Sequence, residues 1–239
     1  MKINFYRTIQ VVLTTIFFCG NLLAQSNYKF HSHNDYAQDF PFWKAYIHGA
    51  SSIEADIFLK NDELYVTHSE DEIQADFTLE NLYLKPLADL AKAGKLRNLQ
   101  LLIDLKSESK TSLKKLVEVL NSYPELTQSD KISFVISGNR PRPNEYKDYP
   151  DFIEFDHQDL SDLEKADLTK VALISQNFRD YSVWNGLGRI TAPELKKVET
   201  AIKKAHDAGK PFRFWGAPDT KTAWSRFAEM GVDFISTDK

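Results

Sequence analysis

The sequence has a single cysteine, Cys19, which lies inside an apolar run near the N-terminus. If that run is removed, the rest of the chain has no cysteine with which to form a disulfide. The chain also lacks a strong charge of either sign, because its formal net charge is -4 at pH 7 and its pI is about 5.9. No stripe of basic residues with interleaved aromatics is present, so we expect no nucleic-acid partner.

Glycine is scarce, with 9 in 239 residues, and no glycine-rich turn follows the first apolar run after the N-terminal region. Open doubly wound sheets bind phosphates with such a turn, so this fold is only the second choice. The sequence shows no internal repeat, low-complexity segment or interdomain linker. Its hydrophobic content of 42 % suffices for one large core. We therefore expect one domain over residues 26–239, and nothing implies a partner protein.

The N-terminal region has the zones of a secretory signal. Lys2 and Arg7 precede an apolar run over residues 11–24, and small and polar residues follow it. This pattern predicts a signal peptide over residues 1–25 and a secreted or periplasmic protein, with at most peripheral membrane contact. The alternative is an uncleaved anchor, but the run is shorter than the ~20 apolar residues that span a bilayer.

After this segment, apolar runs of strand length alternate with helix-like stretches, as is typical of a parallel sheet. The expected strands are residues 28–33, 52–59, 99–106, 132–137, 152–155, 171–176, 212–215 and 232–236. The expected helices are residues 41–49, 79–94, 109–122, 192–208 and 221–230. Between residues 140 and 150 and between 177 and 190 we expect loops in place of helices. The pattern predicts a small (β/α)8 TIM-type barrel, distorted on one side, with its active site at the carboxyl ends of the strands.

Two carboxylates interrupt the second expected strand. Side chains alternate between the faces of a strand, so Glu54 and Asp56 share one face while Ile53, Ala55 and Ile57 share the other. Two anions this close in a poorly solvated place require a cation or a shared proton. Because hard divalent cations prefer oxygen ligands, the pair indicates a metal site.

The third expected strand repeats the theme. Asp104 and Lys106 have the same parity inside an aliphatic run. They could form a buried ion pair that adds little net stability. The repetition favours the other interpretation, in which Asp104 is a third metal ligand and Lys106 binds an anionic substrate.

Histidines lie beside these strands. His31 and His33 end the first strand and are followed by Asn34, and either ring could turn inward. His68 follows a predicted hairpin that could fold it back over the strand ends. A cation on Glu54, Asp56 and Asp104, two acid–base histidines and a lysine together suit the cleavage of a phosphodiester.

These residues resemble the PLC-like phosphodiesterase superfamily, which includes glycerophosphodiester phosphodiesterases, phosphatidylinositol-specific phospholipases C and sphingomyelinase D. The family pattern is a histidine ending the first strand, Glu-x-Asp on the second, a histidine after a short hairpin, and a carboxylate-x-lysine on the third. The matching positions here are His31, Glu54, Asp56, His68, Asp104 and Lys106. The segment His-Ser-His-Asn-Asp-Tyr at residues 31–36 is most similar to a subgroup that includes the fungal altered inheritance of mitochondria protein 6.

The resemblance implies a phosphoric diester hydrolase that depends on Mg²⁺ or Ca²⁺ and acts on a small phosphodiester or lipid headgroup. It implies that His31 and His68 are catalytic, that Asn34 lies near the phosphate and that Trp215 forms the floor of the pocket. Ser32 replaces the arginine of the glycerophosphodiesterase motif, which puts a glycerophosphodiester substrate in doubt, and His33 is a second candidate for the role of His31. The sequence gives Asp238 a structural role.

Two other functions remain open. A barrel glycosidase would need a carboxylate pair about 5–9.5 Å apart across a sugar, and it would leave the histidines and Lys106 without a role. A non-catalytic module could use the same groups to bind a phosphate-bearing ligand or a metal, because fold resemblance does not establish activity.

Overall fold

The computed structural model describes residues 28–239, and the predicted signal peptide lies outside them. The strands are β1 (Lys29–Ser32), β2 (Ser52–Lys60), β3 (Glu63–Val66), β4 (Leu99–Leu105), β5 (Ile132–Gly138), β6 (Ile153–His157), β7 (Val171–Asn177), β8 (Phe212–Trp215) and β9 (Phe234–Thr237). The α-helices are α1 (Trp43–Ile47), α2 (Lys85–Lys92), α3 (Ser109–Asn121), α4 (Pro124–Thr127), α5 (Ala192–Asp207) and α6 (Lys221–Met230).

Eight of the strands form a closed parallel barrel. The order around the sheet is β1, β9, β8, β7, β6, β5, β4 and β2, and β1 also pairs with β2 to close the ring. The ninth strand, β3, is antiparallel to β2 and forms the predicted hairpin. All eight expected strands and the barrel fold are thus confirmed.

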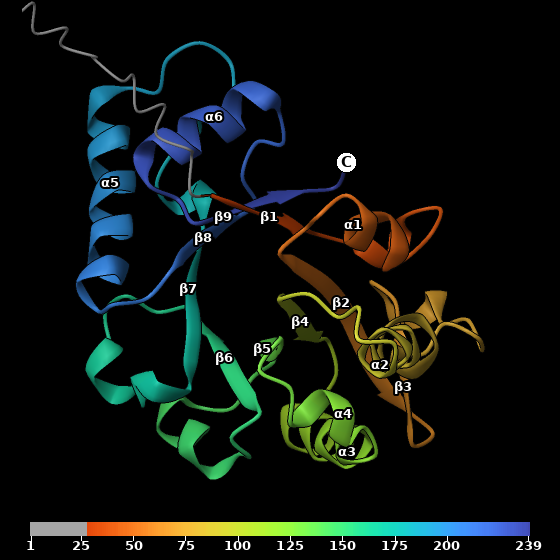
Figure 1. The fold of residues 1–239 in the computed structure, drawn as a ribbon. Helices are drawn as coiled ribbons and strands as arrows, with labels where there is room; N and C mark the ends of the chain where they lie inside the picture. Colours follow the sequence, from red (N-terminus) through yellow and green to blue (C-terminus); the bar gives the residue numbers. More distant parts are fainter. Residues whose placement is uncertain (1–27) are drawn as a thin grey trace, which may run out of the picture.

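Helices cover the outside of the barrel (Figure 1). In that view α5 and α6 lie next to β8 and β9, and α2, α3 and α4 are grouped beyond β2 and β4. Apolar residues recur every three or four positions on the inner side of α3, at Leu113, Leu116 and Leu120. Glu108 caps this helix by accepting hydrogen bonds from the backbone N–H groups of Lys110 and Thr111.

The barrel is distorted where its connections contain 3-10 turns in place of α-helices. Both expected loops are of this kind, since residues 140–150 contain a 3-10 helix and residues 177–190 only the 3-10 turn Phe178–Asp180, and the connection from β6 to β7 is of this kind as well. A 3-10 helix at Pro143–Asp148 joins β5 to β6, and two further 3-10 turns, Leu163–Lys165 and Leu168–Lys170, join β6 to β7. The expected helix over residues 79–94 begins as a π-helical turn, Glu80–Leu84, before α2. None of the described helices is long and apolar enough to cross a bilayer.

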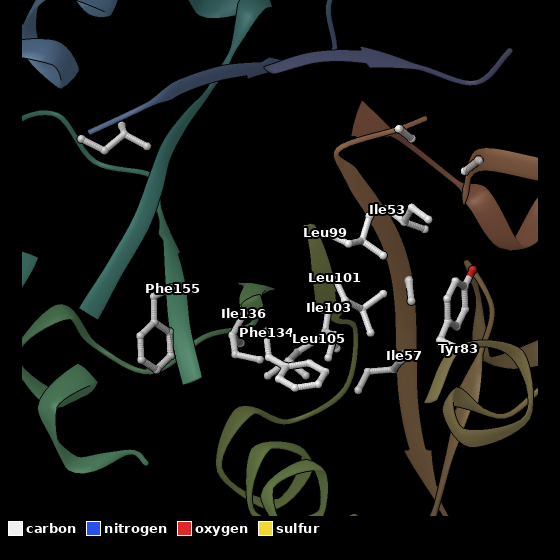
Figure 2. Packing of buried hydrophobic residues seen from close by; sticks show 14 of the residues in the cluster. Ile53, Ile57, Tyr83, Leu99, Leu101, Ile103, Leu105, Phe134, Ile136 and Phe155 are labelled. Atoms are coloured by element: carbon white, nitrogen blue, oxygen red, sulfur yellow. The ribbon is translucent and has the colours of Figure 1, made fainter. Parts of the chain in front are cut away.

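The strands have an apolar outer face, and their inner face is partly apolar and becomes polar toward the carboxyl ends. Figure 2 shows the outward-facing residues of β2, β4, β5 and β6 that pack under the helices, among them Ile53, Ile103, Ile136 and Phe155. Inside the barrel, Val135, Leu173 and Phe234 form a small apolar cluster. The inward residues nearer the carboxyl ends of the same strands are polar, and this layer contains the site.

Candidate active site

Strand register brings the predicted acids together at the end of the barrel formed by the carboxyl ends of the strands. Asp56 of β2 pairs directly with Asp104 of β4, and both are inward-facing. His31 of β1 pairs with Ser52 of β2, so two residues further along, His33 lies level with Glu54. The parallel pairing therefore converts the spacing of these residues in the sequence into a cluster at the carboxyl ends of three neighbouring strands.

Glu54, Asp56 and Asp104 each offer a carboxylate oxygen within 4.8 Å of the others. The side chains of Glu54 and Asp56 are buried, with 5 % and 1 % of their surface exposed. Oδ1 of Asp56 and Oδ1 of Asp104 are buried without a hydrogen-bond partner. A buried carboxylate oxygen with no partner is costly, and a divalent cation would satisfy both. The residues present therefore fit a hard metal ion.

The ionisation of the three acids differs because their neighbours differ. Burial raises the pKa of Asp104 to about 6, although the nearby Lys106 opposes the rise. Burial, and then the charge of Glu54, raise the pKa of Asp56. Burial acts in the same direction on Glu54, but the contacts with His31 and Arg213 outweigh it and lower its pKa. Of the three acids, Glu54 is thus the one whose charged form the surrounding protein stabilises most.

Lys106 lies between two of these acids. Its Nζ is 3.1 Å from Oδ2 of Asp56 and 3.3 Å from Oδ2 of Asp104. Burial lowers its pKa, but the two carboxylates outweigh burial and raise it, so the ammonium stays charged. A quarter of the side chain is exposed. The lysine therefore offers a fixed positive charge at the open end of the cluster.

Gly138 makes room for Asp104. It has a φ of 68°, and a Cβ added there would lie 1.9 Å from Oδ1 of Asp104. We expect Gly138→Ala to lower the free energy of unfolding by more than the ~1–2 kcal/mol that left-handed backbone costs an L-residue, and to weaken cation binding. Urea unfolding and calorimetric titration with Mn²⁺ measure the two effects.

The matched control is Gly94→Ala. Gly94 has a similar φ of 66°, but an added Cβ would meet no atom within 4 Å. It should lower stability without changing cation affinity. Equal cation affinity in the two variants would show that Gly138 does not position Asp104.

The hairpin places His68 at the acidic cluster. Nδ1 of His68 is 3.2 Å from Oδ2 of Asp56, and 70 % of the histidine side chain is exposed. The hydroxyl of Tyr36 donates to the same Asp56 oxygen at 2.7 Å and lies 3.5 Å from Nδ1 of His68. A cavity of about 420 Å³ adjoins these residues and is also lined by Val66 and Phe77.

His33 lies at the opposite side of the cluster, on the extension of β1. Its Nε2 is 3.9 Å from Oε1 of Glu54, and its Nδ1 is 2.7 Å from Oδ1 of Asp238. About a third of the side chain is exposed. Asn34 follows in the left-handed region, with a φ of 48°, and its amide lies 2.9 Å from Nδ1 of His33.

His31 lies one layer deeper in the barrel and is fully buried. Its Nδ1 is 2.7 Å from Oγ of Ser52, and its Nε2 is 2.7 Å from both Oε2 of Glu54 and Nη1 of Arg213. Burial, and then the charge of Arg213, lower the pKa of His31 to about 4. The imidazole is therefore neutral at pH 7, and both of its nitrogens are engaged.

Trp215 is the last residue of β8. Trp215 is two residues beyond Arg213 on the same strand, so its side chain points to the same inner face. It lies at the rim of the barrel, where 38 % of the residue is exposed.

The interpretation of the sequence missed several polar residues of this layer: Tyr36, Asp156, Arg213 and the contact of Asp238 with His33. Arg213 stands at an inward position of the otherwise apolar strand β8, as Glu54 and Asp104 do on their strands, and this pattern could have identified it as a site residue. Asp156 lies in a strand that also contains Glu154 and His157, so its signal was weaker. No local pattern could have identified the contact of Asp238, because 205 residues separate it from His33.

Comparison with known proteins gives two family matches. Residues 25–98 match a family described as "AIM6-like phosphodiesterase domain", and residues 211–239 match the glycerophosphoryl diester phosphodiesterase family. The first segment includes His31, His33, Glu54, Asp56 and His68, and the second begins just before β8.

Two curated relatives are similar to this chain over segments of different length. The altered inheritance of mitochondria protein 6 homolog of Arthroderma benhamiae is 47 % identical over 68 residues, which are 26 % of this chain and 22 % of that protein. The corresponding protein of Zygosaccharomyces rouxii is 26 % identical over 270 aligned positions, which cover 87 % of this chain and 66 % of that protein. This chain thus spans about a fifth of the first relative and two thirds of the second.

A solved structure supports the fold. The crystal structure of a glycerophosphodiester phosphodiesterase from Parabacteroides distasonis has a TM-score of 0.57 and 18 % sequence identity, and the match covers 89 % of this chain and 93 % of that one. The likeness extends over nearly the whole barrel.

Proposed function

Because this chain belongs to the PLC-like phosphodiesterase superfamily, in the subgroup of altered inheritance of mitochondria protein 6, we propose that it is a metal-dependent phosphoric diester hydrolase. The observation that carries the proposal is the buried carboxylate cluster with two unpartnered oxygens, flanked by two accessible imidazoles. The substrate class is a glycerophosphodiester or a phospholipid headgroup ester.

Glu54, Asp56 and Asp104 would hold the cation, and their all-oxygen donor set suits Mg²⁺ or Ca²⁺. When bound, the cation neutralises charge on the phosphate oxygens. Lys106 supplies a second positive charge at the open end of the cluster, where it can contact a phosphate oxygen directly. Asp56 and Asp104 hold the lysine in place, which leaves little reorganisation to be made when substrate binds.

His33 and His68 carry the proton transfers in this proposal. An ionised carboxylate only accepts hydrogen bonds, so Asp56 keeps the proton of His68 on Nδ1. At His33, Oδ1 of Asp238 accepts the Nδ1 proton in this proposal, and the Asn34 amide donates to the same Asp238 oxygen at 3.4 Å instead of to the ring. Nε2 of each ring is then free to exchange a proton with substrate. One histidine is neutral and takes a proton on Nε2 from the attacking hydroxyl or water. The other enters the reaction as imidazolium and gives its Nε2 proton to the leaving alkoxide. His31 is the sequence-based candidate for the first role, but its burial favours His33.

Two further side chains would hold the substrate. Asn34 presents its amide beside His33, where it can donate to a phosphate oxygen. Trp215 provides an exposed aromatic surface at the rim for the organic part of the ester. The cavity beside His68, lined by Tyr36 and Phe77, offers room for the leaving alcohol.

The arrangement of the acids argues against a glycosidase. Such enzymes use two carboxylates about 5–9.5 Å apart with a sugar between them. Here one carboxylate oxygen each from Glu54, Asp56 and Asp104 lies within 4.8 Å of the other two, so all three acids can contact one ion. A cation fits this centre better than a sugar ring does.

Secretion remains a proposal from residues 1–25 alone. It suits an enzyme for a soluble phosphodiester or a headgroup met outside the cytoplasm. N-terminal sequencing of the protein recovered from its native host tests the cleavage, and an intact Met1 on the mature protein would contradict it.

Hydrolysis of bis(p-nitrophenyl) phosphate tests the function directly. We expect turnover that EDTA abolishes and that added Mg²⁺ or Ca²⁺ restores, because the ester needs charge neutralisation at the carboxylate cluster. The control is the same titration on Asp104→Asn, which should be inactive with or without added metal. Turnover that EDTA leaves unchanged would contradict metal dependence, and ligand binding without turnover on any diester would favour a binding module.

A further inference from the structure

The polar interior of the barrel contains a buried cation, Arg213 of β8. Only 3 % of the residue is exposed. Its Nη1 is 3.1 Å from Oε2 of Glu54 and 2.7 Å from Nε2 of His31, and its Nη2 is 3.4 Å from Oδ2 of Asp156 on β6. The guanidinium thus links a proposed metal ligand on β2 to a carboxylate on another wall of the barrel.

Asp156 is itself held firmly. Its Oδ2 accepts hydrogen bonds from Oγ of Ser137 at 3.0 Å, Oγ of Ser175 at 2.7 Å and Nε2 of Gln158 at 3.1 Å. These donors come from β5, β7 and the residue just after β6. Because Asp156 is tied to three neighbouring segments, it is a fixed anchor for the guanidinium.

The two carboxylate oxygens of Glu54 have different contacts. Oε2 is engaged by His31 and Arg213, whereas Oε1 makes no hydrogen bond within residues 28–239 and lies 3.9 Å from Nε2 of His33. A glutamate has more rotatable bonds than an aspartate, so of the three proposed ligands it needs the most help to keep one orientation. Fixing Oε2 leaves Oε1 directed at the cation centre.

We propose that Arg213, anchored by Asp156, is a positioning residue that holds the metal ligand Glu54 in its binding orientation from across the barrel. The inference rests on the proposed function, because it needs Glu54 to be a cation ligand. A role in stability alone explains the arrangement poorly, since buried ion pairs add little net stability compared with apolar packing. Groups that orient metal ligands, in contrast, typically contribute 10–100-fold to affinity.

The test has two measurements. Calorimetric titration of the metal-free protein with Mn²⁺ gives the cation affinity, and thermal unfolding gives the melting temperature. Arg213→Lys keeps a positive charge but loses the planar fork that reaches Glu54 and Asp156 together. Asp156→Asn keeps the shape of the anchor but removes its charge. We expect each to weaken Mn²⁺ binding by about 10–100-fold.

Lys170→Met is the matched control. Lys170 is another largely buried cation, 9 % exposed, and within the described part of the chain its Nζ donates only to the backbone carbonyls of Tyr149 and Pro150. Removing it should lower the melting temperature and leave Mn²⁺ affinity unchanged. The control separates loss of a buried charge from loss of the contact with Glu54.

The outcomes distinguish this inference from the proposed function. Wild-type Mn²⁺ affinity in Arg213→Lys and Asp156→Asn would overturn the positioning role while leaving metal dependence intact. Weakened binding in Lys170→Met by the same factor would also overturn it, because the effect would then be general. Wild-type protein that binds no Mn²⁺ would overturn the proposed metal site and the inference with it.

Discussion

Alanine at His33 is expected to lower kcat on a phosphodiester about 10²–10⁴-fold, and alanine at His68 to lower it by a similar factor. Both rings reach the carboxylate cluster from accessible positions, at 3.9 Å from Glu54 and 3.2 Å from Asp56. Nδ1 of each ring contacts a carboxylate, so Nε2 is the nitrogen that can exchange a proton with the substrate. Steady-state kinetics with bis(p-nitrophenyl) phosphate at saturating metal measures both effects.

The two substitutions should not be additive. Acid and base act in one proton-transfer sequence, so the double variant should be little slower than the slower single variant. His48→Ala is the control, because His48 lies just after α1 and contacts the backbone carbonyl of Lys44 instead of the cluster. Near wild-type kcat in His33→Ala together with a large loss in an unfolding-neutral His31 variant would return the catalytic role to His31.

Much of the fold could be predicted because each barrel strand carries its own signal. β2, β4 and β5 are aliphatic runs bounded by turns, and their period-two pattern defines which face meets the helices. The hairpin to β3 followed from the turn at Asn61 and Asp62, both of which adopt positive φ. The π-helical start of the segment before α2 had no such signal, since its residues suit an α-helix equally well.

The acidic cluster was predictable for the same reason. Glu54 and Asp56 share a face of one strand, Asp104 shares a face with Lys106 on another, and parallel register aligns these strand ends. The strand pattern could have identified the arginine under the cluster, but its partners could not be predicted, because they depend on closure of the ring. His31 and Arg213 are 182 residues apart.

The sequence could not show which of His31 and His33 is catalytic, because both point to the same face of the strand. Two residues along a strand move a side chain by one layer, and the layer decides its environment. His31 pairs with Ser52 and is covered by Arg213, whereas the backbone N–H of His33 bonds to Thr237 at the end of β9. His31 is therefore fully buried, whereas about a third of the His33 side chain is exposed.

The buried state of His31 leads to a second prediction with a large effect. Burial, and then Arg213, lower its pKa from the ordinary value of 6.5 to about 4, so between these pH values the unfolded chain binds a proton that the folded protein does not. Stability conferred by the neutral ring is therefore complete above pH 6.5 and is lost as pH falls toward 4. One pKa unit corresponds to about 1.4 kcal/mol, so the total is about 3 kcal/mol.

The variant His31→Gln removes the titrating imidazole, because the amide of glutamine stays neutral over the same pH range, and the amide can still donate a hydrogen bond to Glu54. Burial also raises the pKa of Asp104, and this carboxyl contributes with the opposite sign, but it is present in both proteins and cancels in their difference. Urea unfolding in EDTA at pH 7 and pH 4 should show wild type losing about 3 kcal/mol relative to the variant. A constant difference would mean that His31 titrates alike in both states. A difference that grows in favour of wild type at low pH would mean that the folded protein holds the imidazolium, and Glu54 would then be its partner.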